Sequence, residues 1–408
     1  MPKKKKWNSG RSNLIKITLL FLLAAAAIIA VRFGNFQPRF ILPEERALLE
    51  ERRASPDNAY PILLEAARLL PESRFTPVRI RSTGRRGRQV SFTQDSIGKL
   101  LHIERPDDDP ELIDLVHRAV PALEKAREVL DKPFLVFEKL APNERGDVVA
   151  RCSNLARHFL ARARIAAYID NEPELAAALL LEALQVARLI AQDDTYGWHI
   201  ERIALKQVRL FARGITSNAS LNLVADSLTV IGPPLSDPEA PIMMFWRDID
   251  RTLETENYPR MDPFSARFMY WRMQKHVDEI MARKEEVYQL TKKPFAEIGP
   301  RPTRPLDDKF RAEINILRNA AELNAEYQAT TLVLALERYN ADNKTYAQQL
   351  TDLSPKYIKE IPQDPITDDS FIYRRTDTDY LLYSQGENGK DDNGTPNQDI
   401  VYVGEKRN

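Results

Sequence analysis

The sequence predicts a mostly α-helical protein that ends in a small α+β region. Hydrophobic residues make up 43% of the 408 residues, which is enough for one or two cores. Up to about residue 310, apolar residues recur at helical spacing and glycine is scarce. Four of the 14 glycines, Gly386, Gly389, Gly394 and Gly404, lie in the last 25 residues, among short tyrosine-rich runs that favour strands.

The N-terminal segment predicts a membrane anchor. Residues 1–13 are basic, and residues 14–33 are long enough, at about 1.5 Å per residue, to cross a hydrocarbon core of roughly 30 Å. Six basic residues, the last of them Lys16, precede the uncharged segment 17–31 of this stretch and few follow it, so the positive-inside rule predicts a cytoplasmic N-terminus. The chain would then be a single-pass inner-membrane protein with a periplasmic bulk. A cleaved signal peptide is the alternative; it is disfavoured because cleavage after Ala30 places Ile28 at position −3.

Residues 34–43 are expected to be a linker, and residues 44–299 a helical domain of paired helices, tetratricopeptide-like in part. One apolar stripe runs from Leu155 to Ile169 and a second from Ala176 to Ile190. Pro173, between them, suits a first helical turn. No further copy follows at a fixed period, so a regular array is not predicted. The same test predicts helices over residues 44–53, 61–70, 111–130, 196–212, 242–256 and 266–290.

Charge and composition narrow the function classes. A net charge of zero argues against a dedicated nucleic-acid binder. The five histidines have no metal-ligand spacing, and neither a nucleophile elbow nor a phosphate-binding glycine loop is present, so no enzyme activity is predicted.

Six arginines between Arg74 and Arg88 could bind phosphate or an anionic glycan, although an exposed connector is favoured. Cys152 is expected to be buried, and the aromatic residues within 264–271 to pack or to bind a partner.

Prolines in residues 300–308 mark the border of a second domain, residues 309–408. A long helix is predicted to end near Tyr339, where the sequence turns polar. A short helix and three strands are expected to follow over residues 347–353, 371–375, 379–383 and 399–402.

The loop Ser384–Gly394 is the most informative segment of this domain. It is rich in Gly, Asn and Asp, which suits a backbone that turns tightly while oxygens converge on a hard cation such as Ca²⁺. An EF-hand does not fit, because aligning its glycine with Gly394 puts Gly389 at the first ligand position and Ile400 where a bidentate Glu is required. A different calcium loop and a merely polar hairpin remain as alternatives.

Taken together, these segments resemble the C-terminal domain of the major pseudopilin of type II secretion systems. The resemblance covers residues 309–408, about a quarter of the chain. It rests on the runs Leu336-Glu337-Arg338-Tyr339, Ile361-Pro362-Gln363-Asp364-Pro365 and Tyr383-Ser384-Gln385-Gly386. The N-terminus lacks the peptidase site of that family, so the chain is not expected to be processed or polymerised as a pilin subunit.

The resemblance implies a structural calcium site formed by Asn388, Asp391, Asp392 and Asp399. Asn388 stands where the family usually has an Asp, which lowers the charge of the site, and Asp391 and Asp392 could restore it. A solvated turn is the alternative.

We therefore expect a non-enzymatic, membrane-anchored scaffold whose calcium-stabilised domain docks onto a protein partner of a secretion or envelope assembly. The alternative is an exported enzyme that acts on envelope polymers through paired carboxylates in the helical domain. No such pair stands out among the 59 acidic residues.

Overall fold

The computed structural model describes most of the chain between residues 43 and 403. The described residues are 43–71, 75–76, 94–95, 97–98, 101, 110–138, 140, 142–214, 217–235, 237–254, 282, 284–299, 310–386, 388–396 and 398–403.

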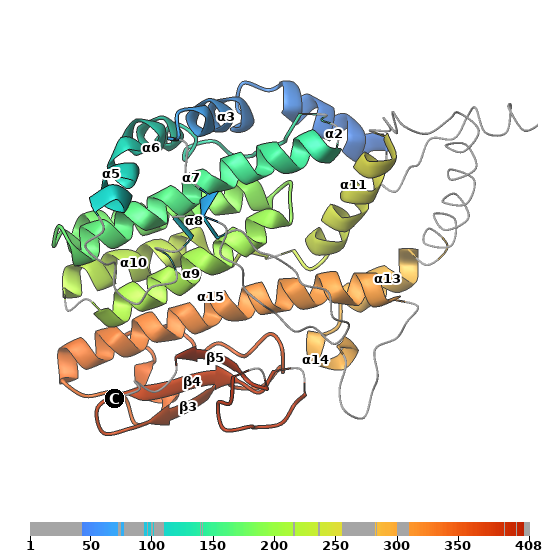
Figure 1. Cartoon of the computed structure of the whole chain (residues 1–408). Coiled ribbons are helices and arrows are strands. Elements are labelled where there is room, and N and C mark those ends of the chain that lie inside the picture. The colour runs from blue at the N-terminus through green and yellow to red at the C-terminus, as the bar shows by residue number, and fades with distance from the viewer. Residues whose placement is uncertain are drawn as a thin grey trace, which may run out of the picture.

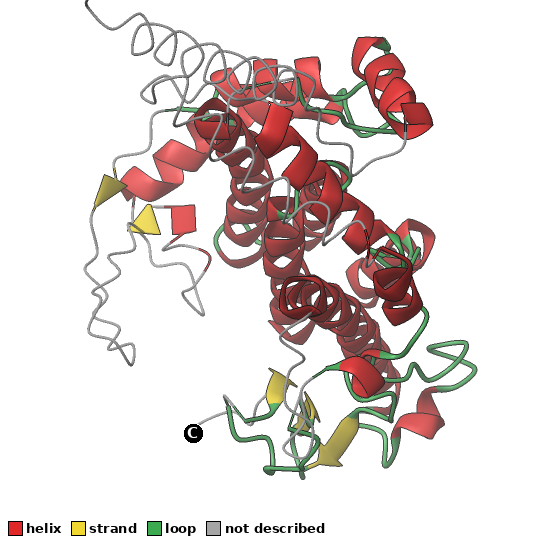
Figure 2. Cartoon of the chain, turned by 90° about the vertical axis from the view of Figure 1, so that its right-hand side faces the viewer, coloured by secondary structure: helices red, strands yellow, loops and turns green. Residues whose placement is uncertain are grey.

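The molecule is a stack of helical layers with a small sheet at one end (Figure 1). Helix α3 (Tyr60–Arg68) contacts α7 (Pro142–Tyr168), α7 contacts α8 (Pro173–Ala191), and α8 contacts α9 (Tyr196–Gly214). Helix α15 (Arg311–Asn343) then packs on α9 and carries the sheet on its other side. Figure 2, turned by 90° from Figure 1, shows the strands of the C-terminal sheet below the helices. The predicted fold class, mostly helical with a C-terminal antiparallel sheet, is confirmed.

The other helices cover the outside of the stack. They are α2 (Pro43–Ala54), α5 (Pro110–Arg118), α6 (Val120–Arg127), α10 (Asn218–Ile231), α11 (Ala240–Glu254), α13 (Lys284–Thr291) and α14 (Phe295–Ile298). A two-stranded ribbon, β1 (Phe75–Thr76) and β2 (Gln94–Asp95), was not predicted.

Local sequence explains why the central helices form. Pro173 occupies the first turn of α8, where a missing N–H costs nothing. Alanine and leucine make up most of α8, so small and large apolar residues face α7, α9 and α10, which all pack against it. Pro121 likewise starts α6 and divides the predicted 111–130 helix into α5 and α6.

The C-terminal unit follows the predicted order. The short helix is a 3-10 turn, η2 (Leu350–Leu353), whose Gln349 and Asp352 form a capping box. Strands β3 (Ile372–Arg375), β4 (Tyr380–Ser384) and β5 (Ile400–Val403) form an antiparallel sheet in that order. All five residues of the central strand β4 are buried.

One hydrophobic core runs through both predicted domains. The buried cluster extends from Ala59 in the upper layers through α8 and α9 to Val403 at the end of the sheet. Helix α15 contacts α9, α10 and α11 directly. The C-terminal unit is therefore packed onto the helical layers and does not hang from them on a linker.

The prediction of a membrane anchor is corrected. None of the helices that the structure describes has the length and apolar character needed to span a bilayer. The longest, α15, carries charged side chains along its length, among them Arg318, Glu326 and Glu337, and packs within the protein. The inner-membrane, periplasmic localisation and the membrane partner depended on that anchor, so they are withdrawn as well.

Several predictions fall outside the described residues. These are the basic N-terminus (1–13), the apolar stretch (14–33), the first linker (34–43, of which only residue 43 is described), most of Arg74–Arg88, the aromatic run 264–271 and the Pro-rich border 300–308.

Candidate functional site

The loop between β4 and β5 is organised around Asp399. This side chain is only 4% exposed. Its two carboxylate oxygens accept hydrogen bonds from the backbone N–H groups of Asp392 (3.4 Å) and Gly394 (2.7 Å). Gly394 has a φ of 73°, and an added Cβ would lie 2.9 Å from the Leu381 side chain. Asp399 thus fixes the turn through which the chain returns to β5.

Asn388 lies beside Asp392. The Asn388 side-chain amide donates to an Asp392 carboxylate oxygen at 2.6 Å, and its carbonyl oxygen accepts from the Lys390 backbone at 2.9 Å. Three of the four predicted site residues, Asn388, Asp392 and Asp399, are therefore linked to one another by direct contacts.

Asp391 is committed to a different set of partners. Its carboxylate accepts from the Tyr383 hydroxyl at 2.6 Å and pairs with the Arg374 guanidinium at 2.6 Å. The Tyr383 hydrogen bond, reinforced by the charge of Arg374, lowers the pKa of Asp391. Burial, and then the hydrogen bond to Asp391, raises the pKa of Tyr383. Asp391 thereby ties the loop to strands β3 and β4.

These contacts bear on the predicted calcium site. Among the residues that the structure describes, no three acidic, histidine or cysteine side chains converge as metal ligands. Both oxygens of Asp399 already accept backbone N–H groups, and Asp391 is paired with Arg374. A Ca²⁺ ion, which takes six to eight oxygens, would have to share these carboxylate oxygens with their present partners. Calcium binding stays a prediction from the resemblance.

Asp364 is a structural residue to which the sequence analysis gave no role. It is 1% exposed and accepts hydrogen bonds from the Ser384 and Thr367 hydroxyls and from the Ile366 backbone. Its position between two prolines, in the run Pro362-Gln363-Asp364-Pro365, was the available signal. An Asp that caps its own backbone two residues on is typical of such turns.

Arg213 joins the helical layers to the sheet. From α9, its guanidinium contacts both Asp379 oxygens at 2.6 Å and lies 3.9 Å from Glu337 of α15. Glu337, 6% exposed, also accepts hydrogen bonds from the hydroxyls of Tyr346 and Tyr380. We call these five residues the junction cluster.

Two further arginines of α9 contact α15. Arg202 pairs with Glu322 at 2.7 Å and donates to the Asn319 carbonyl. Arg209 pairs with Glu326 at 2.5 Å, donates to the Thr330 hydroxyl and lies over the Tyr402 ring of β5. Arg202, Arg209 and Arg213 therefore form a row along the α9–α15 contact.

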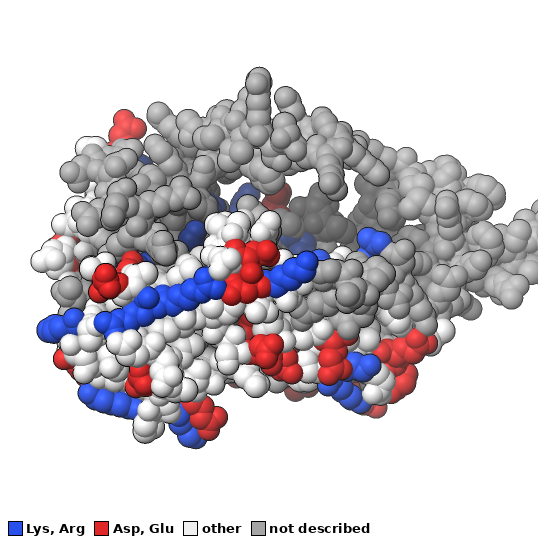
Figure 3. All heavy atoms as spheres, turned by 90° about the horizontal axis from the view of Figure 1, so that it is seen from below, with Lys and Arg blue, Asp and Glu red and all other residues white. Residues whose placement is uncertain are grey.

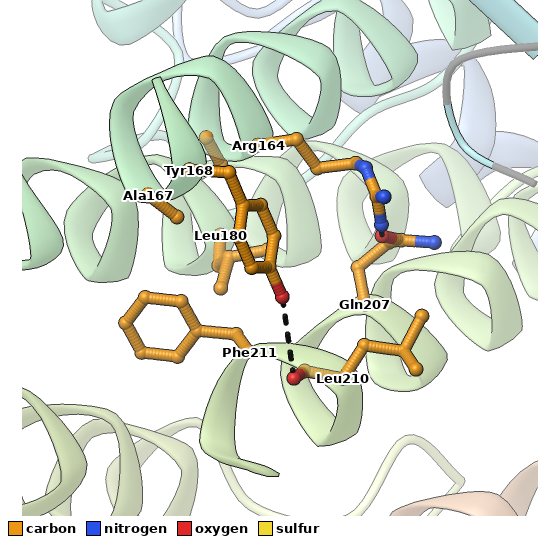
Figure 4. Close-up of a pocket in the computed structure, with 8 residues that line it drawn as sticks. Arg164, Ala167, Tyr168, Leu180, Gln207, Leu210 and Phe211 are labelled. Atoms are coloured by element: carbon orange, nitrogen blue, oxygen red, sulfur yellow. Dashed lines mark hydrogen bonds between the residues drawn. The ribbon is translucent and has the colours of Figure 1, made fainter. Parts of the chain in front are cut away.

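A small pocket lies among α7, α8 and α9 (Figure 4). It encloses about 210 Å³, a volume that includes open solvent. Arg164 and Gln207 meet on one side through a 2.9 Å hydrogen bond, and Phe211 lies on the other. Ligand pockets enclose roughly 300–1,000 Å³, so this pocket is too small for a drug-sized organic substrate.

Comparisons with known proteins give no relative. No family model, no curated protein and no solved structure matches the chain. Functional inference therefore depends on the site itself.

Proposed function

We propose that this protein is a non-catalytic scaffold that presents its C-terminal sheet and loop to a protein partner, in an assembly of the secretion or envelope type. The observation that carries the proposal is the division of the C-terminal unit into two sides. One side is fixed to α9 by the arginine row, and the other is exposed and internally cross-linked.

The fixed side supports a scaffold because it removes freedom of movement. Arg209 and Arg213 are largely buried, and each contacts more than one residue of the C-terminal unit. Charge-assisted hydrogen bonds of this kind hold two elements in one orientation. A partner would meet a surface of fixed orientation, so little entropy would be lost on binding.

The exposed side supports a binding surface because it is ordered and charged. Arg374 and Asp391 pair there with side-chain exposures of 41% and 35%. Lys390 and Asn393 are exposed beside them. Figure 3 views the molecule from the side of the sheet and shows a row of Lys and Arg side chains broken by Asp and Glu. Mixed charge of this kind gives specificity and steering to a protein partner.

No observation favours the alternative, an enzyme acting on envelope polymers. Such an enzyme needs two carboxylates that face one cleft. The pocket in Figure 4 is lined by no acidic residue. The buried carboxylates Glu201 and Glu337 contact arginines inside the protein.

Quantitative affinity capture tests the proposal. Full-length wild-type protein, a Lys390→Glu variant and a Lys206→Glu variant serve as baits in an extract of the native host. Lys390 lies in the loop, whereas Lys206 is an exposed lysine of α9, so it controls for the charge change itself. We expect a protein captured by the wild type to be lost at least tenfold with Lys390→Glu and retained with Lys206→Glu.

The opposite outcome is equally clear. Capture of the same proteins in the same amounts by all three baits would show that the loop does not contact a partner. Equal loss with both variants would place the binding surface elsewhere. Either result overturns the proposal.

A further inference from the structure

The junction cluster holds more acid than base. It contains one cation, Arg213, and two carboxyl groups, Asp379 and Glu337, and the hydroxyls of Tyr346 and Tyr380 donate to Glu337. Asp379 is 6% exposed and Glu337 is 6% exposed, so solvent does little to screen them. If both carboxyls are ionised, the cluster has a net charge of −1 inside the protein.

We propose that the junction cluster is a proton-dependent clamp that holds the C-terminal sheet on α9. With a proton on Glu337, Arg213 and Asp379 form a balanced pair and the clamp is closed. When Glu337 loses that proton, the unbalanced negative charge loosens the contact between α9 and the sheet. This inference does not rest on the proposed function.

The contacts decide which carboxyl carries the proton. Arg213 contacts both Asp379 oxygens at 2.6 Å, so this carboxyl is paired directly with the cation. Its distance to Glu337 is 3.9 Å, so the attraction there is weaker. Burial raises the pKa of Glu337, although hydrogen bonds from Tyr380 and Tyr346 and the charge of Arg213 oppose this. Glu337 is therefore the group that titrates.

The groups that face Glu337 can accommodate its proton. From α9 the only charged neighbour among the described contacts is Arg213. From the sheet side Asp379 adds negative charge, and Tyr380 donates a hydrogen bond at 3.0 Å. The Tyr346 hydroxyl lies 3.1 Å and 3.4 Å from the two carboxyl oxygens of Glu337. It can donate a hydrogen bond to the ionised carboxylate, and it can accept one from the protonated carboxyl group.

The direction of the pH effect follows from linkage. A carboxyl whose pKa is higher in the folded than in the unfolded protein stabilises the fold at low pH. That contribution is lost as the pH rises through the folded-state pKa of Glu337. The junction should therefore loosen as the pH rises above the ordinary range of a glutamate.

Hydrogen exchange of the full-length protein between pH 5 and pH 8.5 tests the clamp. After correction for the intrinsic pH dependence, we expect exchange in the peptides covering β4 and the C-terminal end of α9 to quicken at least threefold in the wild type. A Glu337→Gln variant, which is neutral at every pH, should show no such increase. Glu322→Gln, on the same helix but paired with the more exposed Arg202, is the matched control and should behave as the wild type.

A second measurement stands if Glu337→Gln folds poorly. In the wild type and in Glu322→Gln, the infrared C=O band of protonated carboxyl groups should fall over the same pH range in which exchange of the β4 peptides quickens. The same pH slope of exchange in the wild type and Glu337→Gln would overturn the clamp. So would an infrared band in the wild type that stays constant over the pH range in which exchange quickens.

Discussion

At the scale of single residues, the described structure is held by buried and partly buried arginines that each contact several elements. Arg188 of α8 contacts Glu201 of α9 and also donates to the Ile231 and Gly232 carbonyls at 2.9 Å and 2.7 Å. The Arg188 side chain therefore pairs with the Glu201 carboxylate, which is 1% exposed, and it also caps the C-terminal end of α10. This role could not be predicted from the sequence, because the three partners are distant along the chain.

Removing Arg188 should be costly. Arg188→Ala leaves Glu201 buried without its cation, and burial already raises the pKa of that carboxyl. We expect a loss of about 3–5 kcal/mol in the free energy of unfolding, measured by urea denaturation. Arg188→Met with Glu201→Met should recover most of this loss, since replacing both charges avoids the unpaired carboxylate. A double variant as unstable as Arg188→Ala would contradict the explanation.

The loop offers a second prediction for a single residue. Asp399→Ala removes two hydrogen bonds to backbone N–H groups at the turn. We expect a loss of about 2–3 kcal/mol, at roughly 1–1.5 kcal/mol for each charge-assisted bond. This loss should be present in chelator as well as in calcium, because the bonds need no metal.

Calcium binding can be decided in the same experiment. If the resemblance is right, calcium at 100 times its Kd stabilises the wild type by about 2.7 kcal/mol, and Asp399→Ala abolishes that gain. If the melting temperature of the wild type is the same in calcium and in chelator, the loop is held by its own hydrogen bonds alone.

At the scale of elements, the predictable part of the fold was the part with strong local signals. Periodic apolar stripes and proline positions gave α7, α8 and the division at Pro121. Helix α10 was missed, although Ser217 caps it and Leu221, Val224 and Leu228 lie buried at helical spacing. Its short length and its exposed Leu223 and Val230 weaken the contrast between the two faces.

The candidate site was predictable only in part, for a related reason. The composition of the loop pointed to a polar turn, and Asn388, Asp392 and Asp399 do lie together. The partners that satisfy its acids, Arg374 and Tyr383, come from neighbouring strands. Pairing across strands depends on register, which a single sequence does not reveal.

Two glycines provide a matched test of how the elements end. Gly232 stops α10 with a φ of 74°, where an L side chain is strained although nothing lies within 4 Å of an added Cβ. Gly146 lies within α7, exposed and equally unobstructed. We expect Gly232→Ala to destabilise the protein by about 1 kcal/mol or more and Gly146→Ala to stabilise it by about 0.5–1 kcal/mol, both measured by denaturant titration. The same sign for both variants would refute this account of the α10 terminus.

At the scale of the whole molecule, the continuous core determines how the protein unfolds. The buried cluster extends from Ala59 to Val403, and the arginine row of α9 adds ion pairs to α15 and to Asp379 beside β4. Separating the C-terminal unit would expose apolar surface on both α9 and α15. The helical layers and the sheet are therefore expected to stabilise each other and to melt together.

The aromatic residues allow this expectation to be measured with two independent probes. All four tryptophans lie before residue 309, whereas eight of the 14 tyrosines lie in residues 309–408. Trp198 of α9 and Trp246 of α11 are buried in the described helices, so tryptophan fluorescence reports on the helical layers, and hydrogen exchange of β4 peptides reports on the sheet. In the wild type we expect both to give one coincident urea transition. Replacing Arg202, Arg209 and Arg213 together by Ala should separate the transitions, with the sheet melting first, because it loses its ion pairs to α9 while the upper layers keep theirs.

Replacing Lys125, Arg118 and Arg127, which pair on the outer layers, should leave the two probes coincident. Two separate transitions in the wild type would instead mean that the C-terminal unit is stable without the helical layers, and that the arginine row orients the sheet without stabilising it.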